Sequence, residues 1–337
     1  MSRYTIRGSA ELDARIDADL ARIAKVASPC SIAGILLGGY GRGEGTPFIH
    51  PDGTHSPFND YDLVVIVDKP DREVRHLFKA YAQQLSAELG LPVDLCVYDK
   101  NRLPHCESSL LNYEMKHGHK VVWGDEHILD AMPDYPVSDI PLSEGARLLL
   151  NRGKLLLDIK LRLAEGQALS EEEKIRFIKF IYKVWLAIGD CVLLAERSYD
   201  LSYRIKRERI ASIGDIPHRD VIVEKYCDAV DLKEWGDYPA RLDADLAESF
   251  CAVRDLFREF FPWYRAHHAG PECSMIKALL LNLKWNGRPL PQHPRTYLYD
   301  ALQELLKDEP SEYRLREMMF TRDNFTERFY AMQQRFS

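Results

Sequence analysis

Glycines with the spacing of a phosphate-handling turn gather in one short part of the sequence. The apolar run of residues 31–37, SIAGILL, is followed directly by Gly38 and Gly39, and further glycines stand at positions 41, 43 and 45. A glycine turn after a strand lets the backbone approach a ligand closely, and its N–H groups can hold phosphate oxygens. The sequence therefore predicts an anion-binding turn at this point.

Three aspartates stand at the starts of two apolar runs further along the chain. Asp60 and Asp62 introduce residues 62–67, DLVVIV, and Asp94 lies at the start of residues 92–98, PVDLCVY. Residues i and i+2 of a strand point to the same side, so Asp60 and Asp62 are expected to share one small volume. Mg²⁺ relieves the repulsion between such carboxylates and bridges to substrate phosphates. Three acids beside a phosphate cradle suggest phosphoryl chemistry with two Mg²⁺ ions, or Mn²⁺ in their place.

The elements that must position these residues alternate between helix and strand. Apolar periodicity predicts helices at residues 11–27, 71–89 and 107–117, and strands at residues 31–37, 62–67, 92–98 and 120–123. This alternation predicts an α/β domain in which a mixed sheet is flanked by helices.

A proline-rich connector separates this part from a different pattern. Residues 133–141, PDYPVSDIP, carry prolines that end helices and stiffen the chain, so we divide the protein into domains at 1–135 and 142–337. The second domain is predicted to be an all-α helical bundle. Ser170, followed by three glutamates, is expected to cap one of its helices. The predicted helices cover residues 143–164, 170–196, 242–267, 274–283, 297–307 and 323–336.

The charge, apolar runs and cysteines of the sequence make some classes of partner and some cellular locations less favoured than others. With 45 Lys and Arg against 52 Asp and Glu, the net charge is −7, which makes nucleic acid a less favoured partner. The apolar runs are far too short to span a membrane. Seven cysteines without a CxxC pair argue against a disulfide framework and against a thiolate zinc site, and they fit a cytoplasmic protein.

The glycine turn, the Asp-x-Asp strand and the lone Asp of a third strand together resemble the DNA polymerase β-like nucleotidyltransferase superfamily. Residues 38–44, GGYGRGE, look particularly like the same stretch in bacterial regulatory uridylyl- and adenylyltransferases. Residues 114–124, EMKHGHKVVWG, resemble the helix, glycine and edge strand that follow the third aspartate in minimal members. The resemblance covers residues 30–130.

The resemblance implies a role for each matching residue. Gly38 and Gly39 would hold a nucleoside triphosphate by its phosphates, Asp60 and Asp62 would bind the metals, and Asp94 would bind one metal and help deprotonate the acceptor. The implied nucleotide-binding residues are Gly38, Gly39, Tyr40, Arg42, Glu44 and Lys154. The implied reaction is attack of a hydroxyl on the α-phosphate, which transfers a nucleoside monophosphate and releases pyrophosphate.

Several stretches depart from the family pattern or lie outside it. Gly39 stands where many members have serine, so backbone donors must bind the phosphate. Residues 46–58 predict an inserted loop in which His50 and His55 are expected to be solvated. Lys154 lies on a polar helix stripe, and the family's helical second domain often adds basic contacts to the triphosphate. Residues 204–209, RIKRER, are interpreted as a solvated helix face.

The glycine-rich stretch does not match two other phosphate-binding motifs. A strict GxGxxG is absent, and so is the Gly-Lys-Ser/Thr of a P-loop. The candidate acceptors are a small hydroxylated molecule such as an aminoglycoside or sugar, a protein hydroxyl, and an RNA end. The acidic charge favours cationic or neutral acceptors. The rival function is a non-catalytic nucleotide-binding sensor or scaffold that retains the fold.

Overall fold

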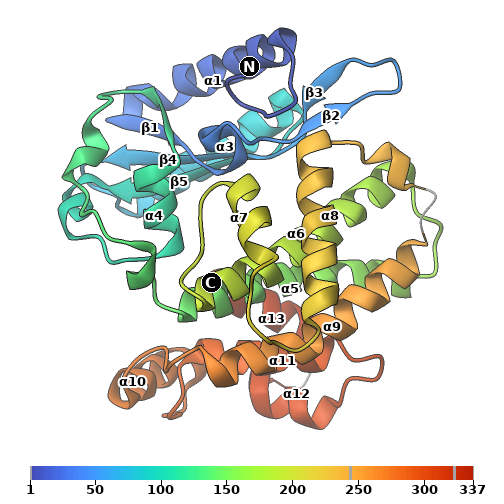
Figure 1. Cartoon of the computed structure of the whole chain (residues 1–337). Helices are drawn as coiled ribbons and strands as arrows, with labels where there is room; N and C mark the ends of the chain where they lie inside the picture. The colour runs from blue at the N-terminus through green and yellow to red at the C-terminus, as the bar shows by residue number, and fades with distance from the viewer. Residues whose placement is uncertain (1, 243–244, 322–323, 337) are drawn as a thin grey trace. The chain divides into compact units, whose positions relative to one another are not determined.

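The computed structural model describes residues 2–242, 245–321 and 324–336, which form two compact units (Figure 1). The first unit runs to Pro141 and also includes Arg197–Arg209 and Val230–Tyr238. The second unit contains the remaining segments, beginning at Leu142. A single boundary between residues 135 and 142 does not account for the two later segments that join the first unit.

A four-stranded sheet is the frame of the first unit. Its strands are ordered β5-β4-β1-β6, with β4 parallel to β5 and β1 antiparallel to both β4 and β6. The sheet is therefore mixed, which confirms the predicted fold class. The strands are β1 (Ala33–Leu36), β4 (Tyr61–Val67), β5 (Val93–Asp99) and β6 (Lys120–Trp123).

Alternating side chains of β4 pack on the two faces of this sheet. Tyr61, Leu63 and Val65 belong to the core formed with α1 (Ala10–Ala27) and α3 (Arg72–Leu89), whose N-caps are Ser9 and Asp71. Val64 and Ile66 belong to the opposite core, which includes Met115 of α4 (Leu110–His117). Because successive strand residues alternate, Asp62 shares the face of Val64.

The segment predicted as an inserted loop is a β-hairpin. β2 (Pro47–Ile49) pairs antiparallel with β3 (His55–Pro57), and Gly53 has a φ of 80° in the connecting turn. Pro47 begins β2 and Pro57 ends β3, where a missing N–H donor costs least. The loop prediction for residues 46–58 is therefore wrong in its secondary structure.

The two later segments of the first unit contact its N-terminal part closely. They include α7 (Tyr203–Ile210) up to Arg209 and the last residues of α8 (Arg219–Trp235). The Tyr238 ring lies 4.5 Å from that of Phe58, and the Arg7 guanidinium lies 3.7 Å from the Trp235 ring centroid. These contacts make distant parts of the sequence one folded unit.

The second unit is mostly helical, as predicted. The serine at the start of α6 forms the predicted cap: Ser170 and Glu173 make a reciprocal capping box. Residues 243–244 and 323, which fall in two of the predicted helices, lie outside the described residues. Two helices, α8 and α12, were not predicted. Besides part of α8, the unit contains α5 (Ser143–Ala164), α6 (Glu171–Ala195), α9 (Leu246–His267), α10 (Met275–Asn286), α11 (Pro294–Leu305), α12 (Glu312–Met319) and α13 (Phe325–Phe336).

No helix among the described residues has both the length and the apolar composition that crossing a membrane requires.

Candidate active site

The glycine turn follows β1 and is held against the next strand. Leu37 N–H donates to the carbonyl of Asp62 at 2.8 Å, and the short helix α2 (Gly38–Arg42) begins at the next residue. Gly38 has a φ of 65°, in the left-handed region, and a Cβ built on it would lie 2.9 Å from Asp62 Oδ2. Glycine at this position therefore serves both the backbone conformation and the close approach of the carboxylate.

Two of the three predicted aspartates are neighbours across the parallel strands. Asp62 of β4 and Asp94 of β5 are register partners. Both line a cavity of about 350 Å³ together with Gly38 and Glu114, all within the first unit. Paired carboxylates beside a glycine turn provide the oxygen donors that Mg²⁺ prefers, and they leave room for a phosphate group.

Asp60 occupies a different position. β4 begins at Tyr61, so Asp60 precedes the strand, where the i, i+2 rule does not fix its direction, and the residues that line the cavity do not include it. Among the residues that the structure describes, no three His, Cys, Asp or Glu side chains are grouped to hold a metal ion. The structure thus brings Asp62 and Asp94 together and leaves the role of Asp60 a prediction.

Tyr40 organises the backbone that leads to Asp60. Its ring is buried, and its hydroxyl accepts hydrogen bonds from Phe58 N–H at 2.9 Å and Asn59 N–H at 3.1 Å. Burial raises the pKa of Tyr40 to about 12, so the phenol stays protonated at neutral pH. Nucleotide binding by Tyr40 stays a prediction.

Arg42 and Glu44 tie the turn to other elements of the first unit. Arg42 forms an ion pair with Glu114 of α4, and its buried Nε has no hydrogen-bond partner among the described residues. Glu44 accepts hydrogen bonds from the Ser202 hydroxyl at 2.6 Å and from Tyr203 N–H at 3.1 Å. These contacts fix where α7 begins beside the turn; nucleotide binding by the two residues stays a prediction.

Two lysines that the sequence did not assign to the site lie near the turn. A Cβ built on Gly39 would be 3.2 Å from Lys233 Nζ, and that Nζ is 5.1 Å from the Tyr203 ring centroid. Lys206 Nζ lies 3.8 Å from the same centroid, and Lys206 is only 1% exposed. The interpretation of residues 204–209 as a solvated face is therefore wrong for Lys206, because it packs against Tyr203, three residues earlier.

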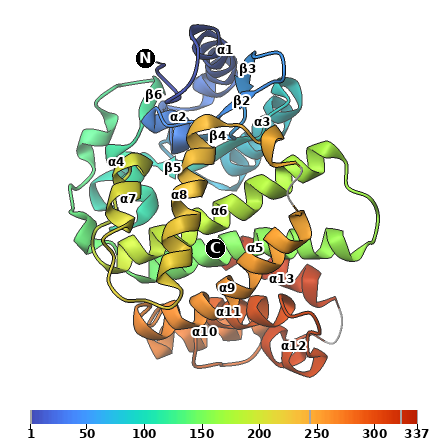
Figure 2. The same ribbon diagram turned by 45° about the vertical axis from the view of Figure 1, so that its right-hand side comes forward.

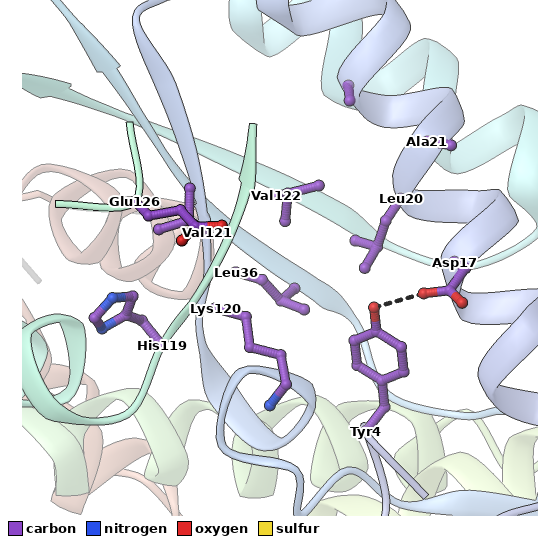
Figure 3. A pocket seen from close by; sticks show the side chains of 11 residues that line it. Tyr4, Asp17, Leu20, Ala21, Leu36, His119, Lys120, Val121, Val122 and Glu126 are labelled. Carbon is purple, nitrogen blue, oxygen red and sulfur yellow. Dashed lines mark hydrogen bonds between the residues drawn. The ribbon is translucent and has the colours of Figure 1, made fainter. Parts of the chain in front are cut away.

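A second cavity, of about 550 Å³, lies between α1 and β6 (Figure 3). Lys120 lines it and donates from Nζ to the carbonyl of Gly41 at 2.7 Å. Burial lowers the pKa of Lys120. Tyr4, also at this cavity, donates to Asp17 at 2.8 Å. The cavity thus borders the hydrogen bond by which Lys120 holds the carbonyl of Gly41 in α2.

The remaining predicted residues belong to elements other than the glycine turn. Lys154 belongs to α5 of the second unit, where its Nζ is 2.9 Å from Asp158 Oδ2 and 4.9 Å from the Tyr330 ring centroid. Its contact with a triphosphate stays a prediction. On the hairpin, His50 Nε2 lies 2.9 Å from Ser56 Oγ, a contact between its two strands.

Comparison with known proteins finds a solved structure that is similar at low identity. No protein-family model matches the sequence, and no curated protein matches it. A crystal structure of a mutant MntA–HpeT toxin–antitoxin complex contains a chain that is 17% identical, with a TM-score of 0.24. The match covers 77% of that chain and 34% of this one, over its N-terminal third. The reaction has to be inferred from the site itself.

Proposed function

We propose that this protein is a Mg²⁺-dependent nucleotidyltransferase that moves a nucleoside monophosphate from a nucleoside triphosphate to a hydroxyl acceptor. One observation carries the proposal: Asp62 and Asp94 stand side by side on parallel strands, facing one cavity with Gly38 of the turn. Carboxylates in that position can hold a cation against phosphate oxygens that the glycine backbone approaches. The odd number of cysteines and the lack of a CxxC pair support a cytoplasmic location.

The proposed reaction is an in-line displacement at the α-phosphorus. The acceptor oxygen forms a bond to that phosphorus, the bond to the β-phosphate oxygen breaks, and pyrophosphate leaves. The hydroxyl proton passes to Asp94, whose side chain is exposed at the cavity. Bound Mg²⁺ would supply the positive charge that stabilises the phosphoryl oxygens. Asp62 would orient the triphosphate through the metal site. We propose that Asp60 completes this site.

The triphosphate is proposed to extend from this cavity over the glycine turn. Lys233 Nζ lies beside the turn, 3.2 Å from where a Cβ on Gly39 would stand. Lys206 adds a buried positive charge behind the Tyr203 ring. We propose that the Lys233 ammonium pairs with a phosphate oxygen of the ligand.

Pyrophosphate release is the direct test of this function. The full chain is incubated with each nucleoside triphosphate, Mg²⁺ and an acceptor from one of two classes: small hydroxylated molecules, including aminoglycosides and sugars, or protein hydroxyls. We expect release that requires both acceptor and Mg²⁺ and that stops when the metal is chelated. Release that persists after chelation would contradict the proposal.

A nucleotide sensor without turnover is the second candidate, and the position of Asp60 outside the cavity lining favours it. The two candidates separate in one experiment. Titration calorimetry with each triphosphate measures binding, and the release assay measures turnover. Tight, Mg²⁺-dependent binding with no release for any acceptor would replace the enzyme by the sensor.

Lys233→Met is expected to weaken nucleoside triphosphate binding by about tenfold, because one charge-assisted contact to phosphate is lost. The matched control is Lys225→Met, on the same helix, where Lys225 Nζ pairs with Glu224 at the surface. Calorimetry should give a higher Kd for the first variant and an unchanged Kd for the second. If both variants bind the triphosphate with the affinity of the wild type, Lys233 does not contact the nucleotide.

A further inference from the structure

Helix α10 of the second unit carries an exposed apolar face. Figures 1 and 2 show α10 next to α11. Four of its large apolar side chains are mostly in solvent, with exposures of 63% for Met275, 70% for Ile276, 64% for Leu280 and 54% for Leu283. Contiguous exposed apolar side chains of this size are typical of interaction sites.

The orientation of α10 is fixed by its opposite face. Ala278 and Asn282 are buried there, and Asn282 Nδ2 donates to the carbonyls of Leu290 at 3.1 Å and Gln292 at 2.6 Å. A rotation that hid the leucines would break these buried hydrogen bonds and expose Ala278. The apolar face therefore points outward because the fold holds it there.

The spacing of the outward residues is that of a coiled-coil seam. Ile276, Leu280 and Leu283 follow one another at intervals of four and three, the d-a-d pattern with which one helix packs against another. In this register Lys277 and Lys284 both occupy e positions, so they lie seven residues apart along one flank of the seam. Charges at e positions determine which partner helix is accepted.

The sequence that contains the seam carries only basic charged residues between Glu272 and Asp300. No aspartate or glutamate occurs in residues 273–299, although the whole chain has a net charge of −7. A second copy of this helix is a poor match: antiparallel pairing would oppose the lysines, and parallel pairing would set Lys284 against Leu279.

We propose that α10 docks a partner protein through an amphipathic helix whose leucine-type seam is flanked by carboxylates. The apolar seam supplies the buried area, and the lysine flank selects an acidic partner over a basic one. This surface lies in the second unit and uses none of the residues assigned to the reaction. The proposal therefore stands or falls separately from the nucleotidyltransferase assignment.

A pair of synthetic helical peptides tests this surface on the full-length protein. One fluorescein-labelled peptide has leucines at the seam and glutamates on the flanks, and the second has lysine in place of each glutamate. Fluorescence anisotropy is expected to show binding of the acidic peptide at least about tenfold tighter than that of the basic one. Leu280→Ser should weaken the acidic peptide by about tenfold. The double variant Lys277→Glu/Lys284→Glu should reverse the preference.

Leu161→Ser is the matched control, because Leu161 is an exposed leucine on α5 of the same unit. It should leave peptide binding unchanged, and circular dichroism should show all variants folded. Three results overturn the proposal: equal or absent binding of the two peptides, a wild-type dimer in analytical ultracentrifugation that Leu280→Ser dissociates, or tighter binding to phosphatidylserine–phosphatidylcholine vesicles than to the acidic peptide.

Discussion

Asp62→Asn and Asp94→Asn are each expected to lower Mg²⁺-dependent pyrophosphate release by about a thousandfold or more. The amide keeps the shape of the side chain but removes the charge that holds a cation against the phosphates. Asp62 is half-buried and Asp94 is exposed, so both carboxylates are in contact with solvent. Because the two positions are register neighbours, loss of one charge also relieves repulsion. We therefore expect unchanged or slightly higher thermal stability alongside the lost activity.

The matched control for these variants is Asp68→Asn. Asp68 is exposed and follows the other end of β4, so it tests the effect of removing an acid next to the same strand but far from the turn. Its activity should equal that of the wild type. Asp60→Asn is expected to lose as much activity as Asp62→Asn, since we propose that Asp60 completes the metal site. If Asp60→Asn stays active, the site is restricted to the two strand carboxylates; if Asp62→Asn stays active, the proposed function fails.

The sheet could be predicted from the sequence because local patterns determine most of it. The β4 run DLVVIV is buried on both faces, and such a strand appears in the sequence as a continuous β-branched stretch. The neighbouring positions of Asp62 and Asp94 follow once the two runs are paired as parallel strands. The helix cap at Ser170 could also be predicted from the sequence, because the serine and Glu173 lie three residues apart.

The lysines at the turn could not be found in the same way. Lys233 approaches Gly39 only because Val230–Tyr238 returns to the first unit, and no periodicity in either stretch encodes that contact. Helix α8 was itself hidden, since Val221, Ile222 and Val223 near its start are β-branched and typical of strands. The placement of Asp60 beside Asp62 stays a prediction for a related reason: the i, i+2 rule holds only inside a strand, and β4 begins one residue later.

Gly38→Ala is expected to reduce turnover by about a hundredfold, because the new methyl group would lie against Asp62 Oδ2 and displace the carboxylate from its place beside Asp94. Alanine at a φ of 65° also costs about 1 kcal/mol of unfolding free energy. Pyrophosphate release measures the first effect, and urea unfolding measures the second. The proposal thus predicts a loss of activity much greater than the modest loss of stability explains.

Gly90→Ala separates these two effects. Gly90 ends α3 with a φ of 72°, and a Cβ built on it meets no heavy atom of the described residues within 4 Å. It should therefore cost the same 1 kcal/mol or so as Gly38→Ala while leaving turnover unchanged. Equal activity losses in both variants would trace the defect at Gly38 to general destabilisation. A loss confined to Gly38→Ala would instead place the defect at the contact between the turn and Asp62, which is the geometry on which the proposed reaction depends.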